Sequence, residues 1–205
     1  MTVDVVLVDL RTEIAEAARA CGWADLERHG DRFLTVMADT DIAALDRTKP
    51  GTAFVSPANS FGEMSGGVDA VLAHRMFPGV EARVKRAFAA KGAVSVFGRA
   101  MLPVGEAVTV PTQTPGVFLI AAPTMVRPGD VRGSENAYQA MYAALDEAHR
   151  HNRETSGEKI RTLITTAMCT GFGMMPPEEA VRQMMEAHAD VLDRWRGVRR
   201  RTVLQ

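Results

Sequence analysis

The sequence is poor in cysteine and in aromatic residues, and it has almost no excess charge of either sign. Its 205 residues include two cysteines, Cys21 and Cys169, too few for a disulfide framework or for a zinc site built from cysteine alone. Aromatic residues make up 6% of the chain, and 24 Lys+Arg against 25 Asp+Glu leave a net charge of -1. This balance excludes a global basic field that would recruit nucleic acid or an anionic membrane.

Long hydrophobic runs and a basic leader are also missing. No apolar stretch approaches the roughly 20 residues that cross a bilayer. The first ten residues, MTVDVVLVDL, lack the basic start of a secretory signal peptide. We therefore expect a cytosolic protein, and the low cysteine content fits a reducing cytoplasm. His149 and His151 lack cysteine or carboxylate partners at ligand spacing, so no metal is expected, and no cofactor is expected either.

What the chain does contain is an alternation of short apolar runs with helical patterns from end to end. The predicted strands are Val3–Leu10, Phe33–Ala38, Thr52–Ser56, Glu106–Val110, Val117–Ala121 and Arg161–Met168. The predicted helices are Glu13–Ala20, Asp69–Met76, Val80–Ala90, Ser134–Arg153 and Pro176–Trp195. This alternation predicts an α/β domain with a mostly parallel central sheet covered by helices. Ligands bind beyond the carboxyl ends of such strands, which points to the loops after Ala38, Ser56, Ala121 and Met168.

Two of these loops are rich in glycine and run directly into a helix. The first reads SPANSFGEMSGGVD from Ser56 to Asp69, and the second reads CTGFGMMPP from Cys169 to Pro177. Glycine lets the backbone approach a phosphate closely, and a helix N-terminus directs N–H groups at the anion. Two such loops on neighbouring strands predict a site that holds a diphosphate from both sides. Neither loop has the P-loop pattern or the G-x-G-x-x-G dinucleotide pattern.

The run SPANSFG followed by GGVD resembles the signature of the macro domain family, whose members bind ADP-ribose. With the run LPVG downstream, the chain is similar to a macro-like subgroup labelled as phage-tail-type. The resemblance covers roughly Val36 to Met185. It implies one macro-like domain over residues 1–205, a three-layer α/β/α sandwich with a mixed, mostly parallel sheet. Residues 1–32 would form an N-terminal strand–helix extension and residues 196–205 a basic tail.

The resemblance also implies which residues contact ADP-ribose. Asn59 matches the family asparagine at the distal ribose, Gly66 to Val68 match the first diphosphate loop, and Thr170 to Gly173 match the second. The implied contacts are Ser56, Ala58, Asn59, Gly66, Gly67, Val68, Pro123, Thr170, Gly171 and Gly173, and Ser56 stands where the family has its first asparagine.

Two contacts have alternatives. Either Asp39 or Asp41 would accept a hydrogen bond from the adenine amino group. The position of Asp39 at a strand end favours it, whereas Asp41 precedes Ile42 and restores the family's Asp-Ile pair. Either Phe172 or Phe61 would cover the distal ribose.

Asp69 follows Gly-Gly-Val directly, where the hydrolytic branch of the family has an aspartate that helps to activate water near the distal ribose. A carboxylate there can orient or deprotonate water, or stabilise positive charge at the anomeric carbon. Its alternative role is to charge the first turn of the following helix. The resemblance thus implies an ADP-ribosyl hydrolase with Asp69 and Asn59 as catalytic residues. Its substrate would be an ADP-ribosylated macromolecule or an ADP-ribose ester.

Two other functions compete with hydrolysis. The first is a binding module that reads ADP-ribose or a related nucleotide without turnover, and the second is a phage-tail-related structural protein. The expected partner is ADP-ribose or an ADP-ribosylated substrate, and nucleic acid is expected only as such a substrate. No membrane partner is expected, and the sequence leaves the oligomeric state open.

Overall fold

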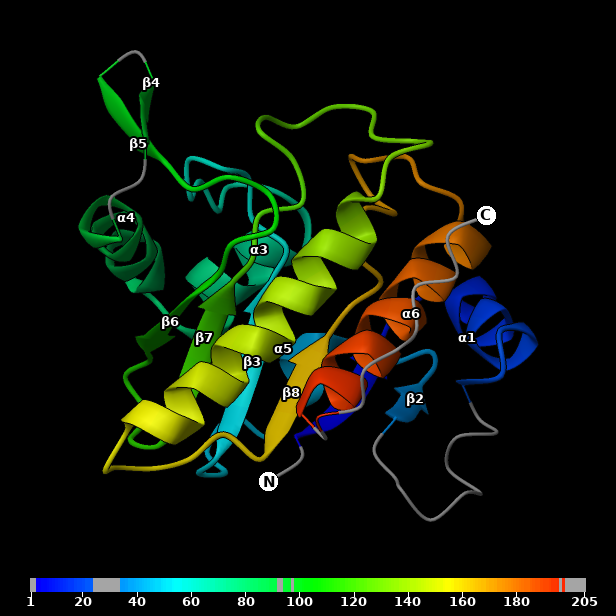
Figure 1. The fold of residues 1–205 in the computed structure, drawn as a ribbon, viewed down its shortest axis with the longest axis horizontal. Helices are drawn as coiled ribbons and strands as arrows, with labels where there is room; N and C mark the ends of the chain where they lie inside the picture. The colour runs from blue at the N-terminus through cyan, green and yellow to red at the C-terminus, as the bar shows by residue number, and fades with distance from the viewer. Residues whose placement is uncertain (1–2, 24–33, 92–93, 97, 196, 198–205) are drawn as a thin grey trace.

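The computed structural model describes residues 3–23, 34–91, 94–96, 98–195 and 197. Its centre is a six-stranded sheet with the order β2-β1-β8-β3-β7-β6 (Figure 1). The strands are β1 (Asp4–Val8), β2 (Leu34–Met37), β3 (Thr52–Ser56), β6 (Val108–Pro111), β7 (Val117–Ala121) and β8 (Thr162–Thr165). Neighbouring strands from β2 to β7 are parallel, and β6 alone in this sheet pairs antiparallel, with β7. The prediction of a mixed, mostly parallel sheet is confirmed.

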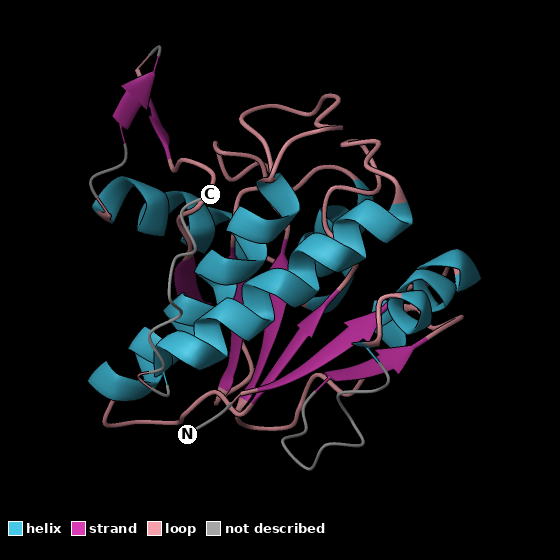
Figure 2. Ribbon diagram, turned by 45° about the vertical axis from the view of Figure 1, so that its right-hand side comes forward, coloured by secondary structure: helices cyan, strands magenta, loops and turns pink. Residues whose placement is uncertain are grey.

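Helices cover both faces of this sheet (Figure 2). One layer holds α1 (Thr12–Ala20), α5 (Asn136–Glu154) and α6 (Pro177–Trp195). The other holds α3 (Gly67–Ala70), the π-helical turn η3 (Val71–Met76) and α4 (Val80–Ala90). A short 3-10 turn, η2 (Ile42–Ala44), follows β2. The predicted three-layer α/β/α arrangement is thereby confirmed.

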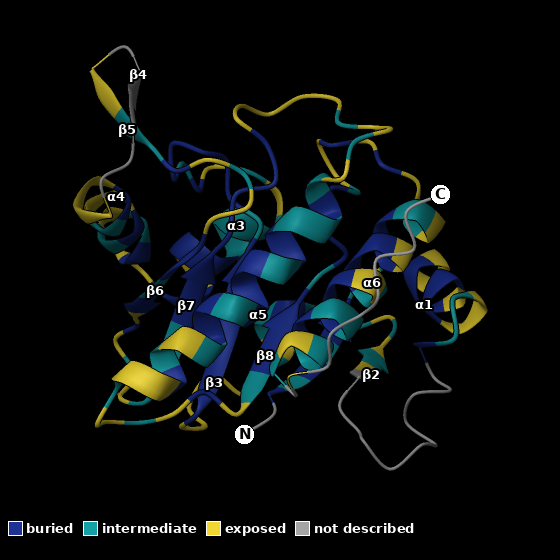
Figure 3. Cartoon of the chain, viewed as in Figure 1, coloured by how far each residue is buried: buried dark blue, intermediate teal, exposed yellow. Residues whose placement is uncertain are grey.

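The sheet divides the hydrophobic core into two halves because successive residues of a strand point to opposite faces. In β3, Ala53 and Val55 pack into the half under α1, α5 and α6, whereas Phe54 packs into the other half. In β8, Leu163 and Ile164 divide in the same way. Strands buried on both faces are apolar at successive positions in their centres, which is why they stand out in the sequence. Figure 3 shows this burial as a dark centre beneath exposed outer helix faces.

Several predicted boundaries differ from the observed ones. The helix predicted over Asp69–Met76 begins at Gly67 and widens at Val71 into a π-helical turn, in which the Phe77 N–H donates to the Leu72 carbonyl at 2.8 Å. The hairpin formed by β4 (Val94–Val96) and β5 (Arg99–Met101) was not predicted, because three-residue strands are too short to show an alternating pattern.

Parts of some predictions lie outside the described residues. These are Phe33 of the second predicted strand, most of the tail 196–205, and residues 1–2 and 24–32 of the proposed extension. The described strand β1 of that extension lies inside the sheet, between β2 and β8. In the described part of the chain, no helix has the length and apolar character needed to cross a membrane.

Candidate ligand-binding site

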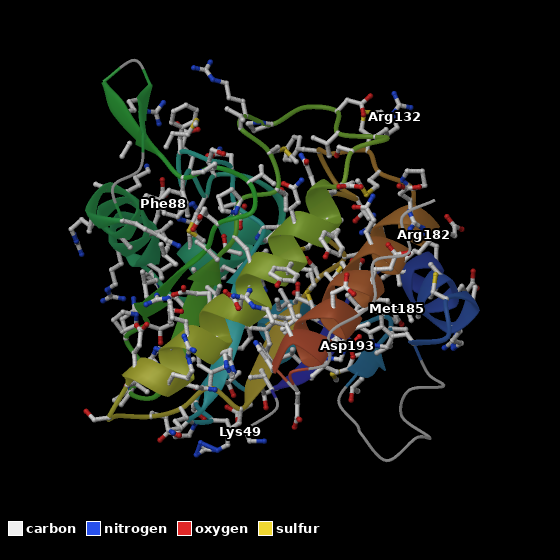
Figure 4. All side chains as sticks on the ribbon, viewed as in Figure 1. Lys49, Phe88, Arg132, Arg182, Met185 and Asp193 are labelled. Carbon is white, nitrogen blue, oxygen red and sulfur yellow. The ribbon has the colours of Figure 1, made fainter. Side chains whose placement is uncertain are left out.

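A cavity of about 570 Å³ lies at the carboxyl ends of the parallel strands. The segments that follow β2, β1, β8, β3 and β7 all contribute to its lining, so the sheet order gives the order of the lining loops across the cavity. The segment that follows β7 continues as a loop above this edge of the sheet, with Arg132 on its outer side (Figure 4). The volume lies within the range of about 300–1,000 Å³ that is typical of small-molecule sites.

Most of the predicted site residues meet in this cavity. Those in its lining are Asp41, Asn59, Gly66, Gly67, Val68, Asp69, Thr170, Gly171, Phe172 and Gly173. Five of the predicted residues are not in its lining: Asp39, Ser56, Ala58, Phe61 and Pro123. In place of Pro123, the segment after β7 brings Thr124 and Met125 to the cavity.

Of the two aspartates proposed for adenine, Asp41 is the one that lines the cavity. Its Oδ1 accepts a hydrogen bond from the Ala43 N–H at 2.9 Å, which caps η2, and its Oδ2 lies 3.5 Å from Nη1 of Arg75. Asp39 has a φ of +49° and is part of the turn that leads from β2 to Asp41. The cap therefore holds the Asp41 carboxylate at the β2 end of the cavity.

The two phenylalanines proposed for the distal ribose have opposite environments. Phe61 is 5% exposed, and the guanidinium groups of Arg99 and Arg127 lie 4.6 Å and 5.5 Å from its ring centroid. Phe172 is 64% exposed and lines the cavity. Its ring lies so close to Gly66 that a Cβ there would be 3.0 Å from the ring carbon Cε2. Phe172 thus bridges the two glycine-rich loops, and it is the one of these two phenylalanines that lines the cavity.

Asp69 lies in the first turn of α3, and Val68 separates it from the glycine pair. The buried Ser56 hydroxyl donates to Asp69 Oδ1 at 2.6 Å. Asp69 is half-buried and lines the cavity, and desolvation of its carboxyl group raises its pKa to about 7. The negative charge of Glu81 adds to the rise, whereas the hydrogen bond from Ser56 opposes it. Asp69 is therefore about half ionised at neutral pH, which suits a group that accepts and returns protons.

Asn59 uses most of its side chain to fix the loop in which it lies. Its Oδ1 accepts from the backbone N–H groups of Phe61 at 3.0 Å and Glu63 at 3.2 Å. Its Nδ2 donates to Glu63 Oε2 at 3.2 Å. One Nδ2 hydrogen is left for a ligand, because an amide nitrogen carries two.

Asp9 and Arg11, which were not predicted as site residues, follow β1 and line the cavity. The Arg11 guanidinium donates to both oxygens of Asp9, at 2.9 and 3.0 Å, and to Thr170 Oγ1 at 2.6 Å. The Thr170 hydroxyl in turn donates to the Ala167 carbonyl at 2.8 Å. The segment after β1 is thereby tied to the second glycine-rich loop. The sequence did contain a signal for them, because two charged residues just after an apolar strand are typical of a binding site at the carboxyl end of that strand.

Four carboxylates line the cavity, and three of them are paired with arginine. The pairs are Asp9 with Arg11, Asp41 with Arg75, and Glu63 with Arg99. Within the described residues, Asp69 forms no salt bridge. Because the paired charges largely cancel, the protonation of Asp69 decides how much negative charge the cavity presents to an anionic ligand.

Neither a metal nor a reactive thiol is indicated at this site. In the described ranges, no cluster of three or more His, Cys, Asp or Glu side chains could hold a metal ion. Cys169 lines the cavity, but burial raises its pKa to about 12, so its thiol stays protonated.

Comparisons with known proteins match this site to a family. The family model described as Macro domain matches residues 55–184, which include both glycine-rich loops. An uncharacterized protein of Aeropyrum pernix is 34% identical over 169 residues, covering 81% of this chain and 76% of that protein. Two solved macrodomain structures from Oceanobacillus iheyensis are among the matches. A mutant is 14% identical, with 76% of this chain and 87% of that chain covered and a TM-score of 0.35. The protein with ADP is 16% identical, with 73% and 90% covered and a TM-score of 0.33.

Proposed function

Because this chain belongs to the macro domain family, we propose that its cavity binds ADP-ribose and that the protein hydrolyses the bond linking ADP-ribose to its carrier. The carrier is a modified macromolecule or the acyl group of an ADP-ribose ester. In the proposed orientation the adenine lies at Asp41 and the diphosphate between the two glycine-rich loops. The distal ribose then lies at Asn59 and Asp69. This orientation follows the order of the loops across the sheet, from β2 to β3.

The observation that carries the proposal is the environment of Asp69. Asp69 lines the cavity, and its carboxyl group is held by Ser56 at 2.6 Å and has a pKa of about 7. A helix cap or a surface charge needs none of these features. A general base at neutral pH needs all three, because it must reach the substrate, keep its orientation and exchange a proton.

In the proposed reaction on a modified macromolecule, a water molecule attacks the anomeric carbon of the distal ribose. The bond from this carbon to the carrier breaks, and its electron pair leaves with the carrier, which then takes a proton from solvent. Asp69 accepts the proton that the attacking water loses. Asn59 uses its remaining Nδ2 hydrogen to hold a ribose hydroxyl.

The first test is a calorimetric titration with ADP-ribose, with AMP and NAD as controls. We expect selective micromolar binding, which corresponds to about -8 kcal/mol. Release of ADP-ribose is then measured on proteins modified at glutamate, aspartate or arginine, on modified nucleic acid and on an ADP-ribose ester. Binding without release from any of these would identify a binding module instead, and absence of binding would overturn the proposal.

A second test uses the hydrogen bond between Ser56 and Asp69. We expect release by the wild type to increase as the pH rises through about 7, since the general base must be ionised. The Ser56 hydroxyl stabilises the ionised carboxylate, so Ser56→Ala should raise the Asp69 pKa. The rise in release rate should then occur at a pH that is higher by about one unit. The measurement is the pH dependence of the release rate from pH 5.5 to 9.

Ser60→Ala is the matched control for this test. Ser60 is also a buried serine of the first loop, but its hydroxyl has no hydrogen-bond partner in the described part of the chain. We expect its pH profile to coincide with that of the wild type. Equal shifts in the two variants would show that the Ser56 hydroxyl does not act on Asp69.

We further propose a cytosolic location and kinship with the phage-tail-type subgroup. Both cysteines are free thiols, as is usual in a reducing compartment. The run SPAN at Ser56 and the run LPVG at Leu102 support the subgroup.

A further inference from the structure

We propose that Glu63 is a specificity-determining residue whose carboxylate accepts hydrogen bonds from the hydroxyls of the distal ribose. It would thereby make the cavity prefer ADP-ribose over ADP. This inference rests on the proposed function, because it assumes that the sugar of ADP-ribose reaches the β3 end of the cavity. Glu63 was not among the residues predicted from the sequence, and the structure brings it to the cavity wall.

The Glu63 carboxylate is held from two sides. Its Oε2 accepts from Asn59 Nδ2 at 3.2 Å, and its Oε1 accepts from Arg99 Nη2 at 2.6 Å. The Glu63 backbone N–H donates to Asn59 Oδ1 at 3.2 Å, so backbone and side chain are both tied to the same asparagine. A side chain held in this way loses little freedom when a ligand binds, which favours affinity.

Part of the hydrogen-bonding capacity of this carboxylate, which belongs to a residue of the cavity lining, is unused. An ionised carboxylate offers about four lone-pair sites, and the two side-chain contacts use one on each oxygen. The Glu63 side chain is 39% exposed, so the unused sites are accessible. The hydrogen bond from Arg99, with smaller contributions from that of Asn59 and from the charge of Arg99, lowers the pKa of Glu63, which keeps the group ionised and therefore purely an acceptor. Neighbouring sugar hydroxyls are donors that such an acceptor can bind.

The position of Glu63 across the cavity fits this role. The sheet order places Asp41 after β2 at one end, the second glycine-rich loop after β8 in the middle, and the Asn59–Glu63 turn after β3 beyond it. A ligand with its adenine at Asp41 and its diphosphate at the glycine loops extends its second sugar toward Glu63. ADP ends at its diphosphate and has no group to place there.

The β4–β5 hairpin supplies the support for Glu63. Arg99 lies on β5, and its guanidinium contacts both the Glu63 carboxylate and the face of the Phe61 ring, 4.6 Å from the ring centroid. The hairpin projects beside α4, away from the main sheet (Figure 1). Its arginine reaches back to the cavity wall, so the hairpin is a positioning element for the sugar end of the site.

The test compares two ligands in calorimetric titrations of the wild type and Glu63→Gln. We expect the wild type to bind ADP-ribose more tightly than ADP, and the ratio of the two affinities to fall at least about tenfold in Glu63→Gln, the usual effect of losing hydrogen bonds to a charged group. The affinity for ADP should stay the same or rise, since one negative charge is removed. Arg99→Gln, which keeps the carboxylate but frees its orientation, should lower the ratio by a smaller factor.

Glu106→Gln is the matched control, because Glu106 is paired with Lys91 at 2.6 Å and is not in the lining of the cavity. We expect it to leave the affinity ratio unchanged. An unchanged ratio in Glu63→Gln, or equal losses for both ligands, would overturn the role of Glu63 and leave ADP-ribose binding intact. Failure of the wild type to bind ADP-ribose would overturn the proposed function together with this inference.

Discussion

Replacement of Asp69 by asparagine is expected to abolish the release of ADP-ribose and to stabilise the folded protein at pH 8. The loss of activity follows because an amide cannot accept the proton of the attacking water. Binding of ADP-ribose should remain within about tenfold of the wild type, which is about 1.4 kcal/mol. The amide oxygen can still accept from the Ser56 hydroxyl, so the local structure should persist.

The gain in stability follows from the raised pKa of Asp69. In the folded chain this pKa is about 7, whereas in the unfolded chain it is about 3.9. Between these values the folded chain binds more protons, so the free energy of unfolding falls as the pH rises from about 4 to 7. Above pH 7 the carboxylate is ionised in both states, and its burial lowers the free energy of unfolding by about 2–4 kcal/mol. Asparagine has no charge to bury. The gain in the free energy of unfolding of Asp69→Asn over the wild type should therefore be large at pH 8 and nearly absent at pH 4.

Thermal unfolding at pH 4 and pH 8, together with release assays, measures both effects. We expect Asp69→Asn to melt roughly 5–10 °C above the wild type at pH 8. Asp46→Asn is the control, because the exposed Asp46 carboxylate accepts from Thr48 and its pKa is lowered, so its replacement should give no gain at pH 8. Release by Asp69→Asn at the wild-type rate would remove Asp69 from the mechanism. A melting difference independent of pH would contradict its raised pKa.

Gly173→Ala is expected to distort the second glycine-rich loop and to weaken ADP-ribose binding at least about tenfold. A Cβ on Gly173 would lie 2.4 Å from the Cys169 carbonyl oxygen and 2.8 Å from Cγ2 of Val131. The Cys169 carbonyl also accepts from the Met175 N–H at 3.0 Å, and the Gly173 carbonyl accepts from the Val131 N–H at 2.9 Å. The backbone must therefore move, at a cost of about 1–3 kcal/mol.

Gly171→Ala provides the contrast within the same loop. A Cβ at Gly171 would meet no atom within 4 Å, so its stability should stay within about 0.5 kcal/mol of the wild type. Denaturant unfolding and titration with ADP-ribose of the two variants measure the difference. Equal stability of Gly171→Ala and Gly173→Ala would show that the crowding at Gly173 is relieved without cost.

The parts of the fold that could be predicted depend on local patterns. Thr52–Ser56 and Val117–Ala121 are strands with the predicted bounds, because a central strand buried on both faces shows a nearly continuous apolar run. The glycine-rich loops were likewise visible as motifs, and the macro domain family is confirmed by its matching model.

The missed parts of the site depend on contacts between residues far apart in the sequence. Arg11 binds Thr170, 159 residues away, and Arg99 binds Glu63 from a hairpin too short to show a pattern. The choice between Asp39 and Asp41 depends on how the chain turns after β2, where the Asp41 carboxylate caps η2. Proximity of this kind follows from the topology of the sheet, which one sequence does not display.

The place of β1 in the sheet also governs how the protein can form during synthesis. Of the six strands of this sheet, β1 is made first, but its neighbour β8 begins at Thr162. At about 5–20 residues per second, a ribosome needs roughly 10–30 s to reach β8 after completing β1. During this time β1 can pair only with β2, and a two-stranded pair is marginally stable in water. The nascent chain therefore carries an open, apolar strand edge until β8 is made, so the first of the six strands to be made is among the last to be fully paired.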